Sequence, residues 1–318
     1  MLAWLFPGQG SQAVGMGRDV HAASPAAREV FERADEALGF PLSRLCFEGP
    51  EAELRRTEIQ QPAILATSVA LLRALEAEVG GKLRPACVGG HSLGEYTALV
   101  ASGALGFEEA VRLVALRGRL MQEAVPEGRG SMAAVLGLPA PVVEEVCDRA
   151  REETGGVVTP AGYNAPEQTS IAGHREAVER ARELALEAGA RRCVALDVSA
   201  PFHCPLMAPA AEKLDAELAA ASFADPDPPV VANVDARPNR RADRIRELLR
   251  RQVTEPVRFV EMIRTLRGLG VTHVLEVGPG RVLSGLAGRI DRDLARASVS
   301  SAAGLAAAAA FAREGVAG

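Results

Sequence analysis

The chain has few aromatic residues and almost no lysine. Aromatic residues make up 4% of its 318 residues, and Trp4 is the only tryptophan, so small aliphatic side chains must fill the core. Lysine occurs only at Lys82 and Lys213, so arginine supplies nearly all the positive charge. The formal net charge of −5 argues against a general nucleic-acid-binding protein, because proteins that bind a polyanion usually carry an excess of basic residues.

Cysteines are scattered, and long hydrophobic runs are absent. No two cysteines form a C-x-x-C pair, and no histidine and cysteine cluster has the spacing of a metal site, so we expect reduced thiols and no metal. There is no run of about 18 apolar residues, and no basic residue precedes the short apolar segment 2–6. These features predict a cytoplasmic protein that is neither exported nor membrane-spanning. The five cysteines are Cys46, Cys87, Cys147, Cys193 and Cys204.

Short apolar runs alternate with amphipathic helical stretches, which is typical of an α/β protein with a largely parallel sheet. A chain of this length can bury roughly three quarters of its surface in one or two well-packed domains. The expected strands of the main sheet include 2–6, 86–90 and 271–277, and the expected helices include 25–38, 62–79, 93–101 and 107–124.

This rhythm changes between about Glu127 and Asp197, where the predicted order is strand, helix, strand, strand, helix, strand. That βαββαβ order is the split motif of a ferredoxin-like subdomain, although the same elements could instead extend the main sheet. We therefore expect a large α/β subdomain from 1–126 and 198–318, with a small ferredoxin-like subdomain at 127–197. The alanine-rich stretch 300–318 is expected to form a terminal helix that frays.

The strongest local signal is the sequence Gly90-His91-Ser92-Leu93-Gly94, a G-x-S-x-G motif between an apolar strand and a helix. A sharp strand-to-helix turn needs small residues at both flanks, exposes the serine hydroxyl and leaves backbone N–H groups free at the start of the helix. We therefore interpret Ser92 as a nucleophile rather than a structural turn residue. The N–H of Leu93 would be one donor to an oxyanion.

A serine nucleophile needs a base, and His203 is the histidine best placed to supply it. It lies in a proline-bounded loop after a strand, where α/β folds position catalytic groups. By elimination it is the general base, and later the acid that protonates the leaving thiolate. The group that orients it stays open here, since Asp197 or a backbone carbonyl could do so. The four histidines set aside lie next to Ser92, in polar helical segments or in a buried strand pattern: His91, His21, His174 and His273.

Arg117 lies in the middle of an apolar helix stripe, unlike Arg112 and Arg119, which have polar residues one turn away. A buried guanidinium without a partner is very costly, so it must meet a carboxylate that is internal or brought by a substrate. Beside a serine nucleophile, its bidentate fork suits an acyl group with an acid at its far end. Its neighbours along the stripe are Leu113, Val114, Leu120 and Met121.

Two further segments invite a binding interpretation. The glycine-rich segment 8–13 after the first strand satisfies G-x-G-x-x-G/A, but no second strand with an acidic end follows, so a dinucleotide site is disfavoured. Its Gln9 N–H more naturally supplies a second oxyanion donor. The arginine-rich segment 237–251 is either a solvated helix face or a docking patch for an acidic partner.

Six short motifs in order carry a family resemblance. They are Phe6–Gln12 (FPGQGSQ), Gly90–Tyr96 (GHSLGEY), the arginine helix within Leu113–Met121, Asn164–Pro166 (NAP), Phe202–Cys204 (FHC) and Glu276–Gly280 (EVGPG). Together they resemble the malonyl-CoA:acyl carrier protein transacylase family and the related acyltransferase domains of polyketide synthases, over residues 5–290. Several independent matches in order leave little room for chance.

The resemblance implies a hydrolase-like α/β fold with a ferredoxin-like insertion. It also implies that Ser92 forms the acyl-enzyme, that His203 is the base and that Arg117 pairs with the malonyl carboxylate. The backbone N–H groups of Gln9 and Leu93 would form the oxyanion hole. For the orienting group, the resemblance implies the backbone carbonyl of a glutamine that precedes an x-x-x-P-V segment, here Gln252.

The implied activity is ping-pong transfer of a malonyl group from malonyl-CoA to the phosphopantetheine thiol of an acyl carrier protein, with no cofactor, nucleic acid or membrane involved. Leu93 and Phe202 resemble malonyl-type enzymes, since methylmalonyl-type ones tend to carry glutamine and serine there. Two rivals are weighed. A serine acyl hydrolase of a polyketide pathway would not need Arg117, and a non-catalytic carrier-protein docking module would not need Ser92.

Overall fold

The computed structural model describes residues 1–317, and its large subdomain is built on a six-stranded sheet. The strand order is β10-β9-β1-β2-β7-β8, with every pair parallel except β7 and β8. All five residues of β1 are buried, because helices cover both faces of the sheet. The strands are β1 Leu2–Phe6, β2 Cys87–Gly90, β7 Val230–Val231, β8 Pro238–Asn239, β9 His273–Val277 and β10 Ala295–Val299.

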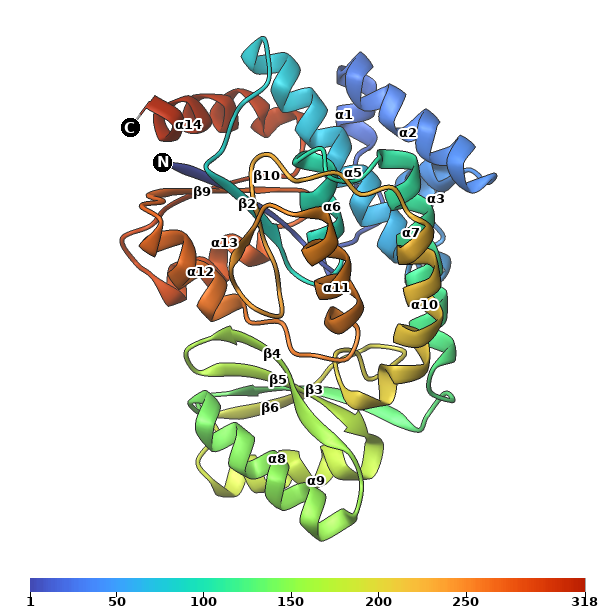
Figure 1. Ribbon diagram of the computed structural model, residues 1–318, viewed down its shortest axis with the longest axis vertical. Helices are drawn as coiled ribbons and strands as arrows, with labels where there is room; N and C mark the ends of the chain where they lie inside the picture. The colour runs from blue at the N-terminus through green and yellow to red at the C-terminus, as the bar shows by residue number, and fades with distance from the viewer. Residues whose placement is uncertain (318) are drawn as a thin grey trace.

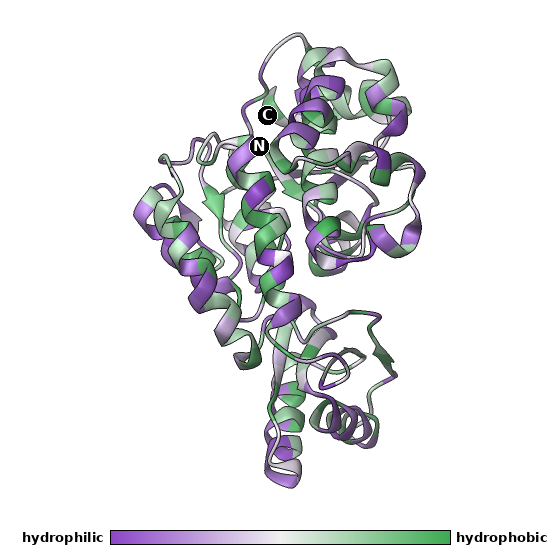
Figure 2. Cartoon of the chain, turned by 90° about the vertical axis from the view of Figure 1, so that its right-hand side faces the viewer, coloured by the Kyte–Doolittle hydropathy of each residue, from purple (hydrophilic) through white to green (hydrophobic). Residues whose placement is uncertain are grey.

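Two helix layers enclose this sheet (Figure 1). Alternate residues of β1 face different cores: Trp4 packs with α5 and its neighbours, whereas Leu5 packs with α12 and α13. The outer helices mix hydrophilic and hydrophobic residues, as Figure 2 shows, which fits one buried and one solvated face. The helices are α1 Arg18–Ala23, α2 Pro25–Leu38, α3 Leu42–Glu48, α4 Glu51–Leu54, α5 Thr57–Val79, α6 Gly94–Ala101, α7 Phe107–Glu123, α10 Ala208–Ala220, α11 Ala242–Gln252, α12 Phe259–Gly268, α13 Val282–Ile290 and α14 Leu305–Ala317.

The segment between α7 and α10 forms a separate four-stranded antiparallel sheet of order β4-β5-β3-β6. Two helices, α8 and α9, cover its face away from the large subdomain (Figure 1), and they share a core with it. The βαββαβ prediction is confirmed, and the alternative of an extended main sheet is wrong. The elements are β3 Gly130–Leu136, α8 Ala140–Thr154, β4 Val158–Ala165, β5 Gln168–His174, α9 Arg175–Glu187 and β6 Arg192–Ala195.

The small sheet is joined to the large subdomain through the backbone of Val257. The Val257 N–H donates to the Ala161 carbonyl at 3.0 Å, and its carbonyl accepts from the Tyr163 N–H at 2.8 Å. This bridge extends the edge strand β4 onto the segment that follows α11, and it ties the end of α11 to the small subdomain. Among residues 1–317, no helix has the length and apolar character needed to cross a membrane.

One expected helix begins at a different residue in the structure. Helix α5 begins at Thr57, so Pro62 lies inside it and not at its first position, because Gln60 and Gln61 are buried and their packing outweighs the hydrogen bond that proline cannot make. The expected terminal helix is present as α14, but it is packed against the rest of the molecule, and fraying at its end stays a prediction. Helix α14 packs against α5 and β10 and buries Ala308 and Ala312.

Candidate active site

A cleft of about 430 Å³ lies between the two subdomains. Its walls come from the loop after β1, the turn after β2, the start of α13 and the inner face of the small sheet. Ser92 and His203 both face it. Other lining residues are Gln9, Gln12, Gln60, His91, Met132, Asn164, Leu196, Phe202 and Val282.

Ser92 occupies a sharp turn between β2 and α6, with a positive φ of 54°. Two glycines permit this turn. A Cβ on Gly90 would lie 2.1 Å from the carbonyl carbon of Gly94, and one on Gly94 would lie 2.0 Å from the Phe6 oxygen. The Ser92 N–H is fixed by the side-chain oxygen of Asn233 at 2.6 Å. The turn therefore fixes the backbone of Ser92 while its hydroxyl faces the cleft.

His203 contacts Ser92 directly. The Ser92 hydroxyl donates to Nε2 of His203 at 2.7 Å, and Nδ1–H of His203 donates to the Gln252 backbone carbonyl at 2.8 Å. Burial, with the nearby charge of Arg117, lowers the pKa of His203 to about 3. The imidazole is therefore neutral near pH 7, with Nε2 free to accept a proton. Asp197, the other group weighed for this position, instead pairs with Arg55 at 2.7 Å.

Arg117 projects from α7 to the base of the cleft and is 1% exposed. One amino group donates to Gln61 Oε1 at 2.7 Å. The other donates to Ser92 Oγ and to Gln252 Oε1, both at 3.0 Å. Its guanidinium carbon lies 5.6 Å from the centre of the Tyr96 ring. No carboxylate oxygen of residues 1–317 lies within 4.0 Å of it, so the internal salt bridge weighed from the sequence is absent from that region.

Two backbone amides are candidates for an oxyanion hole, that of Leu93, which follows Ser92 in the turn, and that of Gln9, which lines the same cleft. Neither donates a hydrogen bond to another group within residues 1–317. Gly8 allows the loop after β1 to approach the turn, since a Cβ there would lie 2.3 Å from the His91 carbonyl oxygen. Donors that are fixed and unengaged are suited to stabilising a developing oxyanion. Phe202 is 6% exposed and lines the cleft next to His203.

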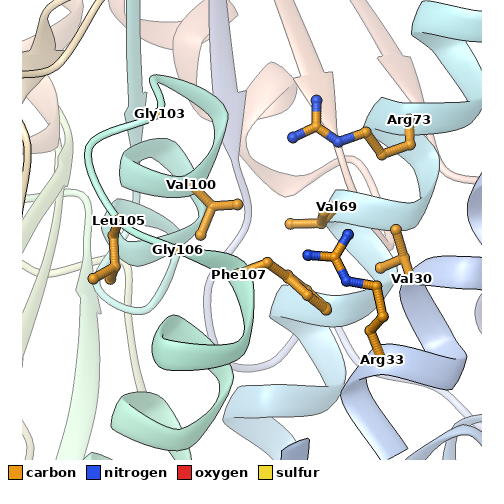
Figure 3. Close-up of a pocket in the computed structure, with 9 residues that line it drawn as sticks. All are labelled: Val30, Arg33, Val69, Arg73, Val100, Gly103, Leu105, Gly106 and Phe107. Atoms are coloured by element: carbon orange, nitrogen blue, oxygen red, sulfur yellow. The ribbon is translucent and has the colours of Figure 1, made fainter. Parts of the chain in front are cut away.

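No second catalytic or metal site is apparent among residues 1–317. A second cavity of about 270 Å³ lies between α2, α5 and α7 (Figure 3), where Arg33 and Arg73 approach from neighbouring helices. Each arginine is paired with a carboxylate, Arg33 with Glu108 and Arg73 with Glu76, both at 2.6 Å. In the described chain, no group of three His, Cys, Asp or Glu side chains could hold a metal ion.

Comparison with known proteins decides the family. Residues 3–304 match the model of the acyl transferase domain. Malonyl CoA-acyl carrier protein transacylase of Escherichia coli strain K12 is 48% identical over 306 residues, which cover 96% of this chain and 98% of that protein. The Bacillus subtilis strain 168 protein of the same name is 48% identical over 94% of this chain and 93% of its own. The chain belongs to the malonyl CoA-acyl carrier protein transacylase family.

Solved structures agree with this family assignment. One, described as a type II PKS acyl-carrier protein in complex with its malonyl-transacylase, superposes with a TM-score of 0.94 at 46% identity and covers 97% of this chain and 99% of that chain. An acyl carrier protein S-malonyltransferase from Vibrio cholerae superposes with a TM-score of 0.92 at 44% identity and covers 96% and 99%. The family resemblance and the fold class predicted from the sequence are confirmed.

In this family member, four side chains around Ser92 received no individual role in the sequence analysis, although Asn164 and Glu95 lie within its motifs. Asn233 and Gln61 contact Ser92 and Arg117 from distant segments. Asn164 contacts His91 at 2.8 Å, and Glu95 is completely buried on α6. Glu95 and Gln61 had a signal available, since each is a polar residue within an otherwise apolar helix stretch. Asn233 had no comparable signal, because it lies in a loop after the two-residue strand β7.

Proposed function

We propose that the protein transfers a malonyl group from malonyl-CoA to the phosphopantetheine thiol of an acyl carrier protein, through an acyl-Ser92 intermediate. One observation carries the proposal: a buried arginine with no carboxylate partner among residues 1–317 lies 3.0 Å from the hydroxyl of a serine that also contacts a neutral histidine. A hydrolase of simple acyl groups has no use for such a cation. A dicarboxylic acyl group supplies the missing negative charge.

In the first half-reaction, Ser92 Oγ attacks the thioester carbonyl carbon while His203 Nε2 accepts its proton. The N–H groups of Gln9 and Leu93 receive the oxyanion. The carbon–sulfur bond then breaks, and His203 returns the proton to the coenzyme A thiolate. The Gln252 carbonyl holds the imidazole in the required tautomer throughout.

In the second half-reaction, the carrier thiol gives its proton to His203 and attacks the ester carbonyl of malonyl-Ser92. The bond from the carbonyl carbon to Oγ breaks, and Ser92 regains its proton. Arg117 holds the malonyl carboxylate in both half-reactions, which requires its guanidinium to exchange the Ser92 contact for the substrate. Phe202 lines the acyl-binding part of the cleft, in accord with a preference for malonyl over methylmalonyl groups.

The proposal extends to organisation and location. Residues 127–197 would be a small subdomain inserted into a large one of residues 1–126 and 198–318, since β3–β6 form a sheet of their own that meets the large subdomain's backbone at the Val257 bridge. The five free cysteines support a cytoplasmic location. The proposed reaction involves neither nucleic acid nor a membrane.

Intact-protein mass spectrometry tests the activity. Mixing the protein with malonyl-CoA should add one malonyl group at Ser92, and a phosphopantetheinylated acyl carrier protein should then remove it. Ser92→Ala should abolish the adduct, and an unchanged activity in this variant would refute Ser92 as the nucleophile, whereas a wild-type protein that forms no adduct but binds the carrier would have only a docking role. An adduct lost to water at the same rate with and without carrier would favour the acyl hydrolase.

A further inference from the structure

The mechanism above gives no task to the buried carboxyl group closest in sequence to Ser92. Glu95 follows Ser92 by three residues on α6 and is 0% exposed. No arginine, lysine or histidine nitrogen of residues 1–317 lies within 4.0 Å of its carboxylate. Burying a carboxylate without a charged partner costs free energy, so we infer that Glu95 has a function near the nucleophile.

Glu95 contacts the two residues that bind the backbone of Ser92, Asn233 at its N–H and Gln252 at its carbonyl. Its Oε2 accepts from the backbone N–H of Asn233 at 2.9 Å and from Nε2 of Gln252 at 2.8 Å. The side chain of Asn233 in turn holds the Ser92 N–H and donates to the Gly90 carbonyl at 2.7 Å. Nε2 of Gln252 also donates to the Ser92 carbonyl at 3.0 Å.

Glu95 also determines which end of the Gln252 amide faces Arg117. A side-chain amide has one accepting end and one donating end. Because Glu95 and the Ser92 carbonyl accept from Nε2, Oε1 of Gln252 must face Arg117, where it accepts from the guanidinium at 3.0 Å. The reverse orientation would place two donors against each other and leave this amino group without its glutamine acceptor.

We propose that Glu95 is a positioning residue, which fixes the Gln252 amide and thereby holds Arg117 and Ser92 in the arrangement that recognises a carboxylate-bearing acyl group. Through Gln252 it is also the indirect negative partner of the buried guanidinium. This inference rests on the role proposed above for Arg117. It adds that recognition of the substrate carboxylate also requires Glu95, which takes no part in the acyl-transfer steps.

Two variants separate positioning from bulk structure. Glu95→Met keeps a similar volume but removes the acceptor, whereas Glu95→Gln keeps an acceptor oxygen and removes only the charge. Mass spectrometry of the full chain gives the rate of Ser92 acylation by malonyl-CoA and by acetyl-CoA, which lacks the free carboxylate. We expect Glu95→Met to reduce the malonyl preference by about tenfold or more, as when a buried polar group loses its partner. The Glu95→Gln variant should lose much less.

A merely structural role predicts a different result, because it would slow acylation by both donors equally. An equal loss, or an unchanged malonyl preference in Glu95→Met, would overturn the proposal. Combining Glu95→Met with Arg117→Ala supplies a second criterion. If Glu95 acts through Arg117, the double variant should lose no more preference than Arg117→Ala alone, and additive losses contradict the proposal. Wild-type protein that malonyl-CoA fails to acylate would instead refute the proposed function.

Discussion

At the scale of single residues, the neutral state of His203 is the feature that prepares Ser92 for attack. An exposed histidine has a pKa near 6.5, so its activity as a base would decline as the pH falls through that value. Burial and the charge of Arg117 lower the pKa of His203 to about 3. We therefore expect kcat/KM for acetyl-CoA to show no loss from histidine protonation between pH 8 and 5, as measured by initial rates of Ser92 acylation.

Two variants assign any pH dependence that does appear. Arg117→Ala removes a cation that lowers the pKa of His203, so a decline in rate should move to higher pH in that variant. Burial raises the pKa of Glu95 to about 7, so a change near pH 7 that disappears in Glu95→Gln belongs to that carboxyl. A decline centred near pH 6.5 in both wild type and Glu95→Gln would contradict the assigned protonation state of His203.

The chemical residues themselves were predictable to different degrees. Ser92 could be predicted because strand, turn and helix signals all lie within a few residues of it. Arg117 could be predicted to be buried, because its neighbours one turn away are apolar. The absence of a carboxylate near Arg117 could not be predicted, because its partners are instead Gln61 and Gln252, which are 56 and 135 residues away along the chain.

At the scale of elements, the crossing of α5 and α7 brings Gln61 within reach of Arg117. Gly118 allows this close approach, because a Cβ there would lie 2.4 Å from the Thr57 carbonyl oxygen and 2.8 Å from Cα of Glu58. These are backbone atoms, so the helices would have to separate. We expect Gly118→Ala to lower the free energy of unfolding by about 1–3 kcal/mol, as overpacked core substitutions do.

Gly285 provides the matched control for this prediction. It lies within helix α13, where an added Cβ would meet no heavy atom of another element within 4 Å, so Gly285→Ala should stabilise the protein by about 0.4–1 kcal/mol. Chemical denaturation of both variants measures the difference. A Gly118→Ala variant as stable as Gly285→Ala would show that the helix crossing does not depend on glycine.

Element boundaries were predictable where local chemistry marks them. Helix α2 begins after Ser24, whose side chain accepts from the Ala27 N–H, and ends at Gly39 in the left-handed conformation. The start of α5 was not predictable in this way. Proline is favoured in the first turn of a helix, which pointed to Pro62, but tertiary packing moves the start to Thr57. The packing of α14 was missed for a related reason. Alanine repeats show weak periodicity, so their buried face is visible only in the folded chain.

At the scale of the whole molecule, the catalytic side chains come from two separate stretches of the large subdomain, and the inner face of the small sheet forms one wall of the cleft. Ser92 and Arg117 come from the large subdomain before the insertion, whereas His203 follows β6 and Gln252 ends α11. The bridge between Val257 and β4 links the small sheet to the segment directly after Gln252. Both walls of the cleft are thereby anchored near the group that orients His203.

Two buried titratable groups, His203 and Glu95, should change the pH dependence of the free energy of unfolding in opposite directions. Below about pH 6.5 the unfolded chain protonates His203 while the native state does not, so His203 lowers the free energy of unfolding as the pH falls toward 3. Glu95 acts in the opposite sense. Its pKa is raised to about 7, so between pH 7 and about 4.3 the native state binds a proton that the unfolded chain does not, which favours folding.

In Glu95→Gln, the stabilising proton uptake by Glu95 is lost and the destabilising effect of His203 remains. As the pH falls from 7 to 5, we expect wild type to gain stability relative to Glu95→Gln by on the order of 1 kcal/mol per pH unit. Urea denaturation at several pH values measures this difference, and the exposed Glu36→Gln serves as the control. The other titrating groups are common to both proteins, so they cancel in the comparison. If the difference stayed constant across this range, Glu95 would have to be ionised in the native state throughout, and the buried carboxylate would then need a stronger partner than two hydrogen bonds.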